Sequence, residues 1–328
     1  MALNIGLNGD IMIALTGGKT GGHVIPLLAL AKKLSKVIYV GAANSLEERL
    51  CLKEKIEFIK MDLPDNSFKT IYKCYRKLEL PKIEAVISTG GYISMPLLIY
   101  AIRHHIPIYL LEENVVMGRA NLLASFFAKR VFLTYELPKM KKKYEVVGLP
   151  TLEREKKYYG YLDFDVLIIG GSLGSKPLCN LVYELNTKYK VCLIAGRYSR
   201  DYQNILNVTV FDYVDDIISL MKQAKVIISR AGASTTYEIF SLEKPCIIIP
   251  SMKTKQNHQY LNALYFEKEN CAVLVKEKDA KKVISAKVDE VIMSDTVAVN
   301  LKQNQKRIFK NNASEAIIKI LKDDLNEL

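Results

Sequence analysis

Short apolar runs alternate with amphipathic stretches along most of the chain, and this alternation limits the possible folds more than any other feature. The runs are apolar on both faces, which is typical of parallel strands in a sheet that helices cover on both sides. Right-handed connections between such strands produce doubly wound α/β domains. We expect strands at residues 11–15, 37–41, 84–89, 106–111 and 130–134, and again at 165–170, 190–194, 225–229, 245–249 and 272–275.

The alternation breaks once, at the polar and irregular segment 149–163. We interpret this segment as a linker between two Rossmann-like domains that face a cleft, the first spanning residues 1–149 and the second residues 150–312. A C-terminal helix of about residues 313–328 is expected to pack back on the first domain. Ligands of such sheets bind at the carboxyl ends of the strands, so the residues that follow each strand are the candidates for a site.

The composition narrows the possible partners. The formal net charge of +12 indicates an anionic partner, which could be nucleic acid, anionic lipid or a phosphorylated substrate. No window approaches the ~18 uninterrupted apolar residues of a membrane span. The six cysteines form no CxxC pair, so neither a zinc site nor a redox motif is predicted. We expect these cysteines to be reduced and buried, as in a cytosolic protein.

A glycine-rich loop with a histidine follows the first predicted strand. Its sequence is TGGKTGGHVIP, in which Gly18, Lys19 and Thr20 resemble the end of a phosphate-binding P-loop. A P-loop would also need a glycine at position 13, which is Ile13, so that interpretation fails. Glycines before a helix still let backbone N–H groups approach an anion closely. A tight turn without a ligand is the alternative, which so many glycines beside His23 make less attractive.

Polar or glycine-rich segments follow four further strands. Glycines precede a helix after strand 84–89, and two adjacent acids follow strand 106–111. A second glycine-rich loop follows strand 165–170. Together these strand ends predict a phosphorylated ligand, although each alone is weak. The segments are GGYISMP (90–96), EEN (112–114), GSLGS (171–175) and RAGASTTYE (230–238).

These segments occur in an order that resembles the MurG family of GT-B glycosyltransferases. The resemblance covers about residues 11–275. It implies transfer of GlcNAc from UDP-GlcNAc to the C4 hydroxyl of the MurNAc of lipid I, with inversion, which yields lipid II for peptidoglycan synthesis. It also implies a peripheral enzyme on the cytoplasmic face of the plasma membrane that uses no cofactor and binds no nucleic acid. The blocks that carry the resemblance are TGGKTGGHVIP, STGGYISMP, LLEENVVMGRAN, IIGGSLGS, RAGASTTYEI and HQYLNA.

The resemblance also implies roles in the first domain, where the acceptor binds. His23 is the expected general base, since the pKa of histidine lies close to working pH; its alternative role is to bind an acceptor phosphate only. Glu112 and Asn114 are the other expected catalytic residues, although Asn114 could simply cap a helix. Lys19 replaces a usual family glycine, and it either adds a phosphate contact or points to solvent. The acceptor-phosphate residues are Thr20, Gly21, Gly22, His23, Gly90, Gly91, Tyr92 and Asn114.

In the second domain the resemblance implies a UDP-GlcNAc site. Backbone N–H groups of the glycine-rich loop would offset the charge of the diphosphate. Glu238 matches the ribose-binding acid of the family, with a helix N-terminal acid as its structural alternative. Val214 lies in a segment that resembles the reader of uracil, and Ala233 and Gln259 match positions near the sugar. The donor residues are Gly171, Ser172, Gly174, Val214, Ala233, Ser234, Thr235, Glu238 and Gln259.

The segment NSFKTIYKCYRKLEL (66–80) is the candidate membrane contact, because the acceptor is a lipid. A helix of this composition can lie in the membrane interface, with each basic residue contributing ~1 kcal/mol on anionic lipid. An ordinary core helix with a solvated basic face is the alternative, and the resemblance favours the membrane. The residues expected to touch it are Phe68, Ile71, Tyr72 and Tyr75, with Lys69, Lys73, Arg76 and Lys77.

We expect transfer without a metal ion. Asp163 and Asp165 form a DxD pattern, the metal motif of another glycosyltransferase class. They enter strand 165–170 at its amino end, away from the expected site, so we predict no metal site. Two other functions stay open: a UDP-sugar-dependent diacylglycerol glycosyltransferase of the same fold, and a non-catalytic nucleic-acid-binding or regulatory module, which only the charge supports.

Overall fold

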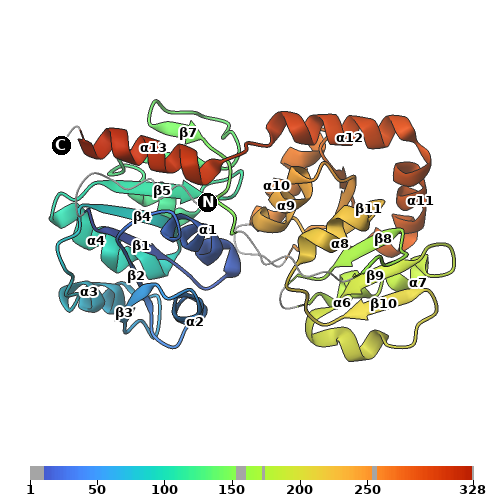
Figure 1. Ribbon diagram of the computed structural model, residues 1–328, viewed down its shortest axis with the longest axis horizontal. Helices are drawn as coiled ribbons and strands as arrows, with labels where there is room; N and C mark the ends of the chain where they lie inside the picture. Colours follow the sequence, from blue (N-terminus) through green and yellow to red (C-terminus); the bar gives the residue numbers. More distant parts are fainter. Residues whose placement is uncertain (1–10, 153–159, 172–173, 253–256, 327–328) are drawn as a thin grey trace. The chain divides into compact units, whose positions relative to one another are not determined.

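A computed structural model describes residues 11–152, 160–171, 174–252 and 257–326 of the chain. The chain divides into two compact units (Figure 1). The first unit comprises Met1–Glu153 together with Lys310–Leu328, and the second comprises Arg154–Phe309. Each unit is built on one parallel sheet, so the predicted α/β class with two doubly wound sheets is confirmed.

The first unit has a seven-stranded sheet in the order β3-β2-β1-β4-β5-β6-β7, with every described strand pair parallel. The order reverses between β1 and β4, and such a reversal opens a crevice at the carboxyl ends of the two strands. In chain order the elements are β1 (Ile13–Gly17), α1 (Gly21–Ala31), β2 (Val37–Ala42), α2 (Leu46–Lys53), β3 (Glu57–Met61), α3 (Phe68–Arg76), β4 (Ala85–Gly90), η1 (Tyr92–Ser94), α4 (Met95–Arg103), β5 (Ile108–Glu112), α5 (Arg119–Ala124), β6 (Arg130–Leu133), β7 (Tyr144–Val146) and α13 (Ala313–Asn326).

Apolar cores cover both faces of this sheet, because successive strand residues point to opposite sides. One core contains Leu110 of β5 together with residues of α3, α4 and α5. The other contains Leu111 of β5 together with residues of α1 and α13. Ile317 and Leu321 of α13 are fully buried there, so the last helix is part of the first unit.

The second unit repeats this architecture with six strands in the order β10-β9-β8-β11-β12-β13. Its order reverses between β8 and β11. In chain order the elements are β8 (Val166–Ile169), α6 (Lys176–Cys179), α7 (Val182–Leu185), β9 (Val191–Ile194), η2 (Gly196–Tyr202), β10 (Val208–Phe211), α8 (Ile217–Gln223), β11 (Val226–Ser229), α9 (Ala233–Ser241), β12 (Cys246–Ile248), α10 (His258–Lys268), β13 (Val273–Leu274), α11 (Ala280–Met293) and α12 (Asp295–Ile308).

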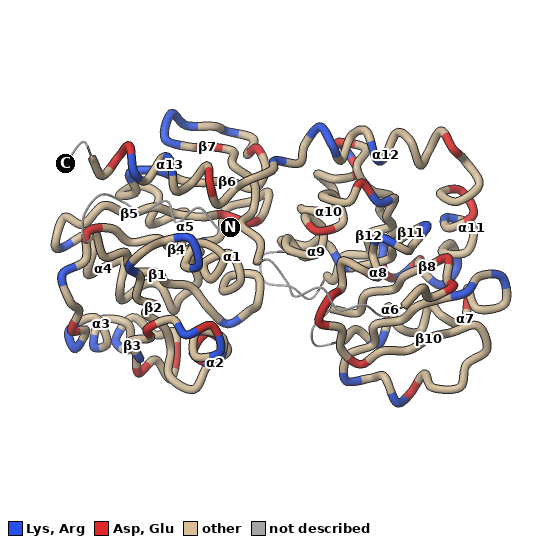
Figure 2. The backbone as a smooth tube through the Cα atoms, viewed as in Figure 1, with Lys and Arg blue, Asp and Glu red and all other residues tan. Residues whose placement is uncertain are grey.

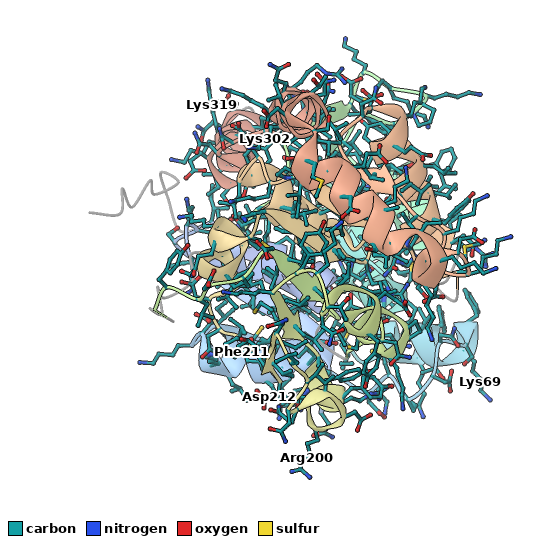
Figure 3. All side chains as sticks on the ribbon, turned by 90° about the vertical axis from the view of Figure 1, so that its right-hand side faces the viewer. Lys69, Arg200, Phe211, Asp212, Lys302 and Lys319 are labelled. Carbon is teal, nitrogen blue, oxygen red and sulfur yellow. The ribbon has the colours of Figure 1, made fainter. Side chains whose placement is uncertain are left out.

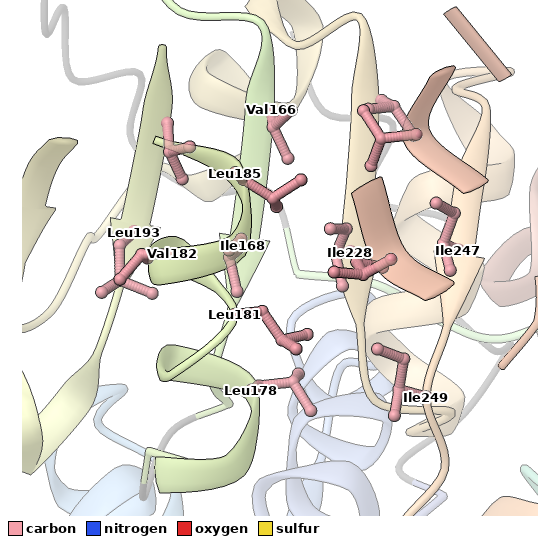
Figure 4. Packing of buried hydrophobic residues seen from close by; sticks show 14 of the residues in the cluster. Val166, Ile168, Leu178, Leu181, Val182, Leu185, Leu193, Ile228, Ile247 and Ile249 are labelled. Carbon is pink, nitrogen blue, oxygen red and sulfur yellow. The ribbon is translucent and has the colours of Figure 1, made fainter. Parts of the chain in front are cut away.

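Branched aliphatic side chains fill the core of the second unit. Val166 and Ile168 of β8, with Ile228 of β11, pack against Leu181 and Leu185 of the helical segment that follows β8 (Figure 4). Their complete burial holds β8 and β11 in the centre of the sheet, with their carboxyl ends next to each other. The loop after each of these strands is therefore fixed at the point where the order reverses.

Candidate active site

The glycine-rich loop after β1 lies against two polar side chains that leave no room for larger residues. A Cβ atom on Gly17 would lie 1.9 Å from Thr89 Oγ1, and one on Gly18 would lie 2.5 Å from Glu47 Oε1. The Thr89 hydroxyl donates a hydrogen bond of 2.8 Å to the carbonyl of His23. Thr89, near the end of β4, thereby fixes the first turn of α1, the helix on which His23 lies.

His23 faces a buried carboxylate. Its Nδ1 lies 3.4 Å from Oε1 of Glu113, and the two side chains are 30% and 4% exposed. Neither atom has a hydrogen-bond partner elsewhere in the described ranges. The structure therefore pairs His23 with Glu113, which sequence reasoning did not select as a site residue.

Glu112, one of the predicted catalytic residues, has a different environment. One carboxylate oxygen accepts hydrogen bonds from the backbone N–H and the side-chain amide of Asn114, at 3.1 and 3.2 Å. The other accepts bonds of 2.9 Å from the backbone of Gly118 and from Nδ2 of Asn121. Four donors thus hold a side chain that is only 2% exposed. This geometry gives Glu112 and Asn114 a part in fixing the loop after β5.

Side chains along β5 point alternately to the two faces of the sheet, which explains why Glu112 and Glu113 have different partners. Glu112 points to the same face as Leu110, where α5 supplies Asn121. Glu113 points to the opposite face, with Leu111, where α1 supplies His23. Reading this period of two through the end of the strand would have placed Glu113 on the face that α1 covers, but not its contact with His23.

The carboxylates also shift the acidity of the site. Burial lowers the pKa of His23, because it penalises the imidazolium, but Glu113 and then Glu112 raise it by more. The pKa of His23 therefore lies above its ordinary value of 6.5. Burial raises the pKa of Glu112, although its hydrogen bonds from Gly118, Asn121 and Asn114 oppose this effect. A histidine of this kind takes up a proton more readily than one in water.

The second glycine pair, after β4, lies beside Lys19. Lys19 has a positive φ of 75°, a backbone conformation that favours glycine, and its amide lies 3.3 Å from Glu47 Oε2, to which it donates. Its ammonium lies 4.4 Å from the centre of the Tyr92 ring. Gly90 and Gly91 also have positive φ, and no described atom lies within 4 Å of a Cβ built on Gly91.

Thr20 is exposed and precedes α1, and Gly21 and Gly22 form the first turn of that helix with His23. The expected acceptor-phosphate residues thus lie at the carboxyl ends of three strands of one sheet. Most of them follow β1 or lie at the end of β4 and directly after it, and Asn114 follows β5, the neighbour of β4.

In the second unit, the glycine-rich loop after β8 is similarly tight. Gly174 has a φ of 73°, and a Cβ atom there would lie 2.4 Å from the carbonyl oxygen of Ala195. The amide of Gly174 donates to the carbonyl of Gly171 over 3.0 Å, so it is engaged within the loop. Ser172, another expected donor residue, lies outside the described residues. The short helix α6 starts directly after this loop, with Ser175 at its N-cap.

Arg230, the first residue after β11, fixes this loop to the rest of the sheet edge. Its guanidinium donates to Ser175 Oγ over 2.7 Å and to the carbonyl of Ile249 over 2.9 Å, and it forms an ion pair with Glu277. Arg230 therefore connects the ends of β8, β11 and β12. Sequence reasoning quoted this arginine without giving it a role, and no local pattern predicts its three partners.

The other expected donor residues lie around the same sheet edge. Ala233 is the first residue of α9, Ser234 and Thr235 follow it, and Glu238 is half-buried one turn further along the helix. The side-chain oxygen of Gln259 accepts a hydrogen bond of 3.0 Å from the amide of Ser251. Asn262 of the same helix, α10, donates to the carbonyl of Ala231 over 3.2 Å, so α10 is fixed to the loop after β11. Val214 is buried in the segment between β10 and α8.

Helix α3 presents most of the expected membrane residues to solvent. Phe68 is 78% exposed and Tyr72 is 47% exposed, and their rings stack on each other. The prediction for Ile71 is wrong: this residue is buried in the core that also contains α4, because its position on the helix points to the sheet. Lys69 projects away from the protein (Figure 3). The other basic residues of this surface, Lys73, Arg76 and Lys77, are also exposed, and Tyr75 is half-buried.

The DxD pattern lies at the amino end of β8, as predicted. Asp163 pairs with Lys190, and Asp165 forms an ion pair of 2.7 Å with Lys225. Within the described ranges, no group of three or more His, Cys, Asp or Glu side chains could hold a metal ion. Among the same residues, no helix combines the length and the apolar character needed to cross a membrane.

Comparisons with known proteins agree with this arrangement. Residues 13–133 match the glycosyltransferase family 28 N-terminal domain, and residues 165–319 match the C-terminal domain of the same family. A Sulfurihydrogenibium sp. (strain YO3AOP1) protein is 30% identical over 346 residues, covering 96% of this chain and 99% of that protein. Its name is UDP-N-acetylglucosamine--N-acetylmuramyl-(pentapeptide) pyrophosphoryl-undecaprenol N-acetylglucosamine transferase.

A Thermosipho africanus (strain TCF52B) protein of the same name is 31% identical over 341 residues, covering 96% of this chain and 99% of that protein. The crystal structure of Acinetobacter baumannii MurG superposes with a TM-score of 0.81 at 22% identity, covering 97% of this chain and 100% of that one, which shows the shared fold. The chain therefore belongs to glycosyltransferase family 28 and, within it, to the MurG family of N-acetylglucosaminyltransferases.

Proposed function

We propose that this protein transfers GlcNAc from UDP-GlcNAc to the C4 hydroxyl of the MurNAc of lipid I, with inversion at the anomeric carbon, and so forms lipid II. The names of its relatives describe transfer of N-acetylglucosamine to an undecaprenol-linked N-acetylmuramyl acceptor. The observation that carries the proposal is the pair of His23 and Glu113 beside the glycine-rich loop after β1. This pair supplies a base at the place where the family resemblance puts the acceptor.

The pair suits proton removal from a hydroxyl. Nδ1 of His23 faces Glu113, which favours the neutral tautomer with its proton on Nδ1. Nε2 is then free to accept the proton of the C4 hydroxyl. The oxygen then attacks the anomeric carbon, and the bond from that carbon to the diphosphate breaks. The Glu113 carboxylate stabilises the imidazolium that forms. A positioned base of this kind contributes roughly 10² to 10⁴ in rate.

The second unit binds the donor in this proposal. Backbone groups of Gly171 and Ser172 hold the diphosphate in a loop whose turn Gly174 and Arg230 fix. Glu238 binds the ribose hydroxyls, Val214 lies at the uracil, and Ala233, Ser234, Thr235 and Gln259 surround the sugar. No metal ion is needed, because backbone donors offset the charge of the leaving group. The lysine partners of Asp163 and Asp165 support this part.

The enzyme acts as a peripheral protein on the cytoplasmic face of the plasma membrane. The relatives' names include an undecaprenol-linked acceptor, which is a membrane lipid. The exposed aromatic and basic residues of α3 support contact with anionic lipid.

Product analysis tests the proposal. The purified protein is incubated with labelled UDP-GlcNAc and either a water-soluble lipid I analogue or diacylglycerol. We expect label in a disaccharide product of the analogue and none in glycolipid. Label in diacylglycerol would instead support the alternative glycosyltransferase, and label in neither acceptor would reject both reactions.

A further inference from the structure

The segment from α5 to Ala128 has its polar and apolar sides reversed relative to an ordinary surface helix. Asn121 and Ser125 are buried, at 1% and 0% exposure, whereas Leu123, Phe126 and Phe127 are 60%, 69% and 62% exposed. Leu122 is also exposed, at 49%. The amides of Phe126 and Phe127 bond to the carbonyls of Leu123 and Ala124, so the turn after α5 continues the helical winding. These four apolar side chains therefore lie on one outward face.

The burial of Asn121 shows that the fold requires this orientation. Its Nδ2 donates to Glu112 Oε2 over 2.9 Å and to the carbonyl of Leu111 over 3.2 Å. Rotating the helix to bury the phenylalanines would break these bonds and leave Glu112 without one of its donors. Contiguous exposed apolar surface of this kind marks an interaction site in soluble proteins.

Cations border this face. The segment 139–143 reads KMKKK, with four lysines and no acidic residue, and its Met140 is 46% exposed. Figure 2 shows these basic residues gathered immediately before β7. The ammonium of Lys141 lies 5.4 Å from the centre of the Phe126 ring, and that of Lys143 donates to the carbonyl of Ala128 over 3.1 Å. The lysine segment is thus attached to the apolar face.

We propose that Leu122, Leu123, Phe126, Phe127 and Met140, with Lys139, Lys141 and Lys142, form a second membrane-docking surface, separate from α3. We call it the α5 surface. Its apolar side chains enter the interfacial region of the bilayer, and its lysines bind the phosphates of anionic lipids. An acidic surface of a protein partner would bind the lysines but would not bury the two neighbouring phenylalanine rings. A bilayer with anionic headgroups satisfies both.

The α5 surface is also joined to the candidate active site. Asn121 on its inner side bonds to Glu112, and the next residue along the strand, Glu113, faces His23. A membrane seated on this surface would contact the helix that holds Glu112, the neighbour of the partner of the proposed base. That position suits an acceptor whose lipid stays in the bilayer.

Vesicle binding tests the α5 surface directly. Sedimentation of the full-length protein with phosphatidylglycerol–phosphatidylcholine vesicles is compared for the wild type and the triple variant Leu123→Ser, Phe126→Ser and Phe127→Ser. We expect the variant to partition roughly a hundredfold more weakly, because three apolar side chains no longer enter the interface. A variant with Lys139, Lys141 and Lys142 changed to Gln should lose part of the preference for phosphatidylglycerol, because the basic residues of α3 remain.

Matched controls separate this surface from general effects. Leu206→Ser with Met293→Ser removes exposed apolar residues of the second unit, at 76% and 70% exposure, and should bind vesicles like the wild type. Transfer to the water-soluble lipid I analogue should persist in the triple serine variant, which shows that it is folded. If the wild type lacks transfer but the vesicle results hold, the proposed function fails and the α5 surface stands.

Two results would overturn the proposal. One is unchanged vesicle binding of the triple serine variant. The other is a wild-type dimer, measured by analytical ultracentrifugation, that dissociates in this variant while vesicle binding does not change; a second copy of the chain would then cover the face.

Discussion

The two glycine-rich loops of this protein occupy equivalent positions but have opposite chemical surroundings. Each follows a central strand at the point where the strand order of its sheet reverses. In the first unit the loop is supported by carboxylates, Glu47 beneath it and Glu113 beside His23. In the second unit the loop is fixed by the guanidinium of Arg230. The proposed function uses this difference: we assign proton removal to the loop of the first unit and binding of the diphosphate to the loop of the second.

The largest effect on activity is expected when the proposed base of the first unit is removed. His23→Ala should lower kcat by ~10²-fold or more, because the proposed mechanism transfers the proton of the acceptor hydroxyl to this side chain. Steady-state kinetics with the soluble acceptor measure this change, and His105→Ala, an exposed histidine, is the control. If His23→Ala turned over like the wild type, His23 would not be the base, and the proposed role of the first unit in proton transfer would be wrong.

A smaller effect is expected on the donor side. Glu238→Ala should raise the KM for UDP-GlcNAc by roughly tenfold and leave kcat close to normal, since hydrogen bonds from the ribose hydroxyls to a carboxylate contribute about 1.5–3 kcal/mol. Initial rates over a donor concentration series give both constants. Glu267→Ala on α10 is an exposed control. An unchanged KM would make Glu238 a structural helix acid.

Glu113→Gln sharpens the account of His23. Without the carboxylate the burial of His23 dominates, so its pKa should fall, and the acidic limb of the pH–rate profile should move to lower pH. The raised pKa also means that the pair stabilises the fold below pH 6.5, and that this contribution is lost as pH rises through the folded value. Profiles of kcat/KM measured from pH 5 to pH 9 test this. If the acidic limb did not move, Glu113 would have no effect on the pKa of the base.

The smallest expected effect is that of metal removal. Excess EDTA should leave transfer within error of the untreated enzyme, because we propose that backbone donors of the second unit offset the leaving-group charge. Loss of activity that magnesium or manganese restores would give the diphosphate a different partner and reopen the question of Asp163 and Asp165.

The sequence predicted the centres of the sheets better than their edges. The buried strands β1, β4, β8 and β11 are continuous apolar runs, and each was expected close to its observed bounds. The strands that sequence reasoning missed, β3, β7 and β10, all lie at sheet edges. β3 reads EFIKM, in which charged residues interrupt the apolar run because one side of an edge strand faces water.

The candidate site shows the same limit. Local patterns placed His23 and the glycines correctly at strand ends. The partner of His23 and the role of Arg230 depend on which face of a strand a side chain occupies and on contacts between distant segments. Arg230 reaches Ser175, 55 positions away, and Glu277, 47 positions away, so no window of the sequence contains both partners.

Calorimetric titration of UDP into the wild type, His23→Ala and Glu238→Ala tests the division of labour between the two units most directly. We expect His23→Ala to bind UDP like the wild type, because its side chain belongs to the unit to which we assign the acceptor. Glu238→Ala should bind UDP about tenfold more weakly. Loss of UDP binding in His23→Ala, with wild-type binding in Glu238→Ala, would contradict the division.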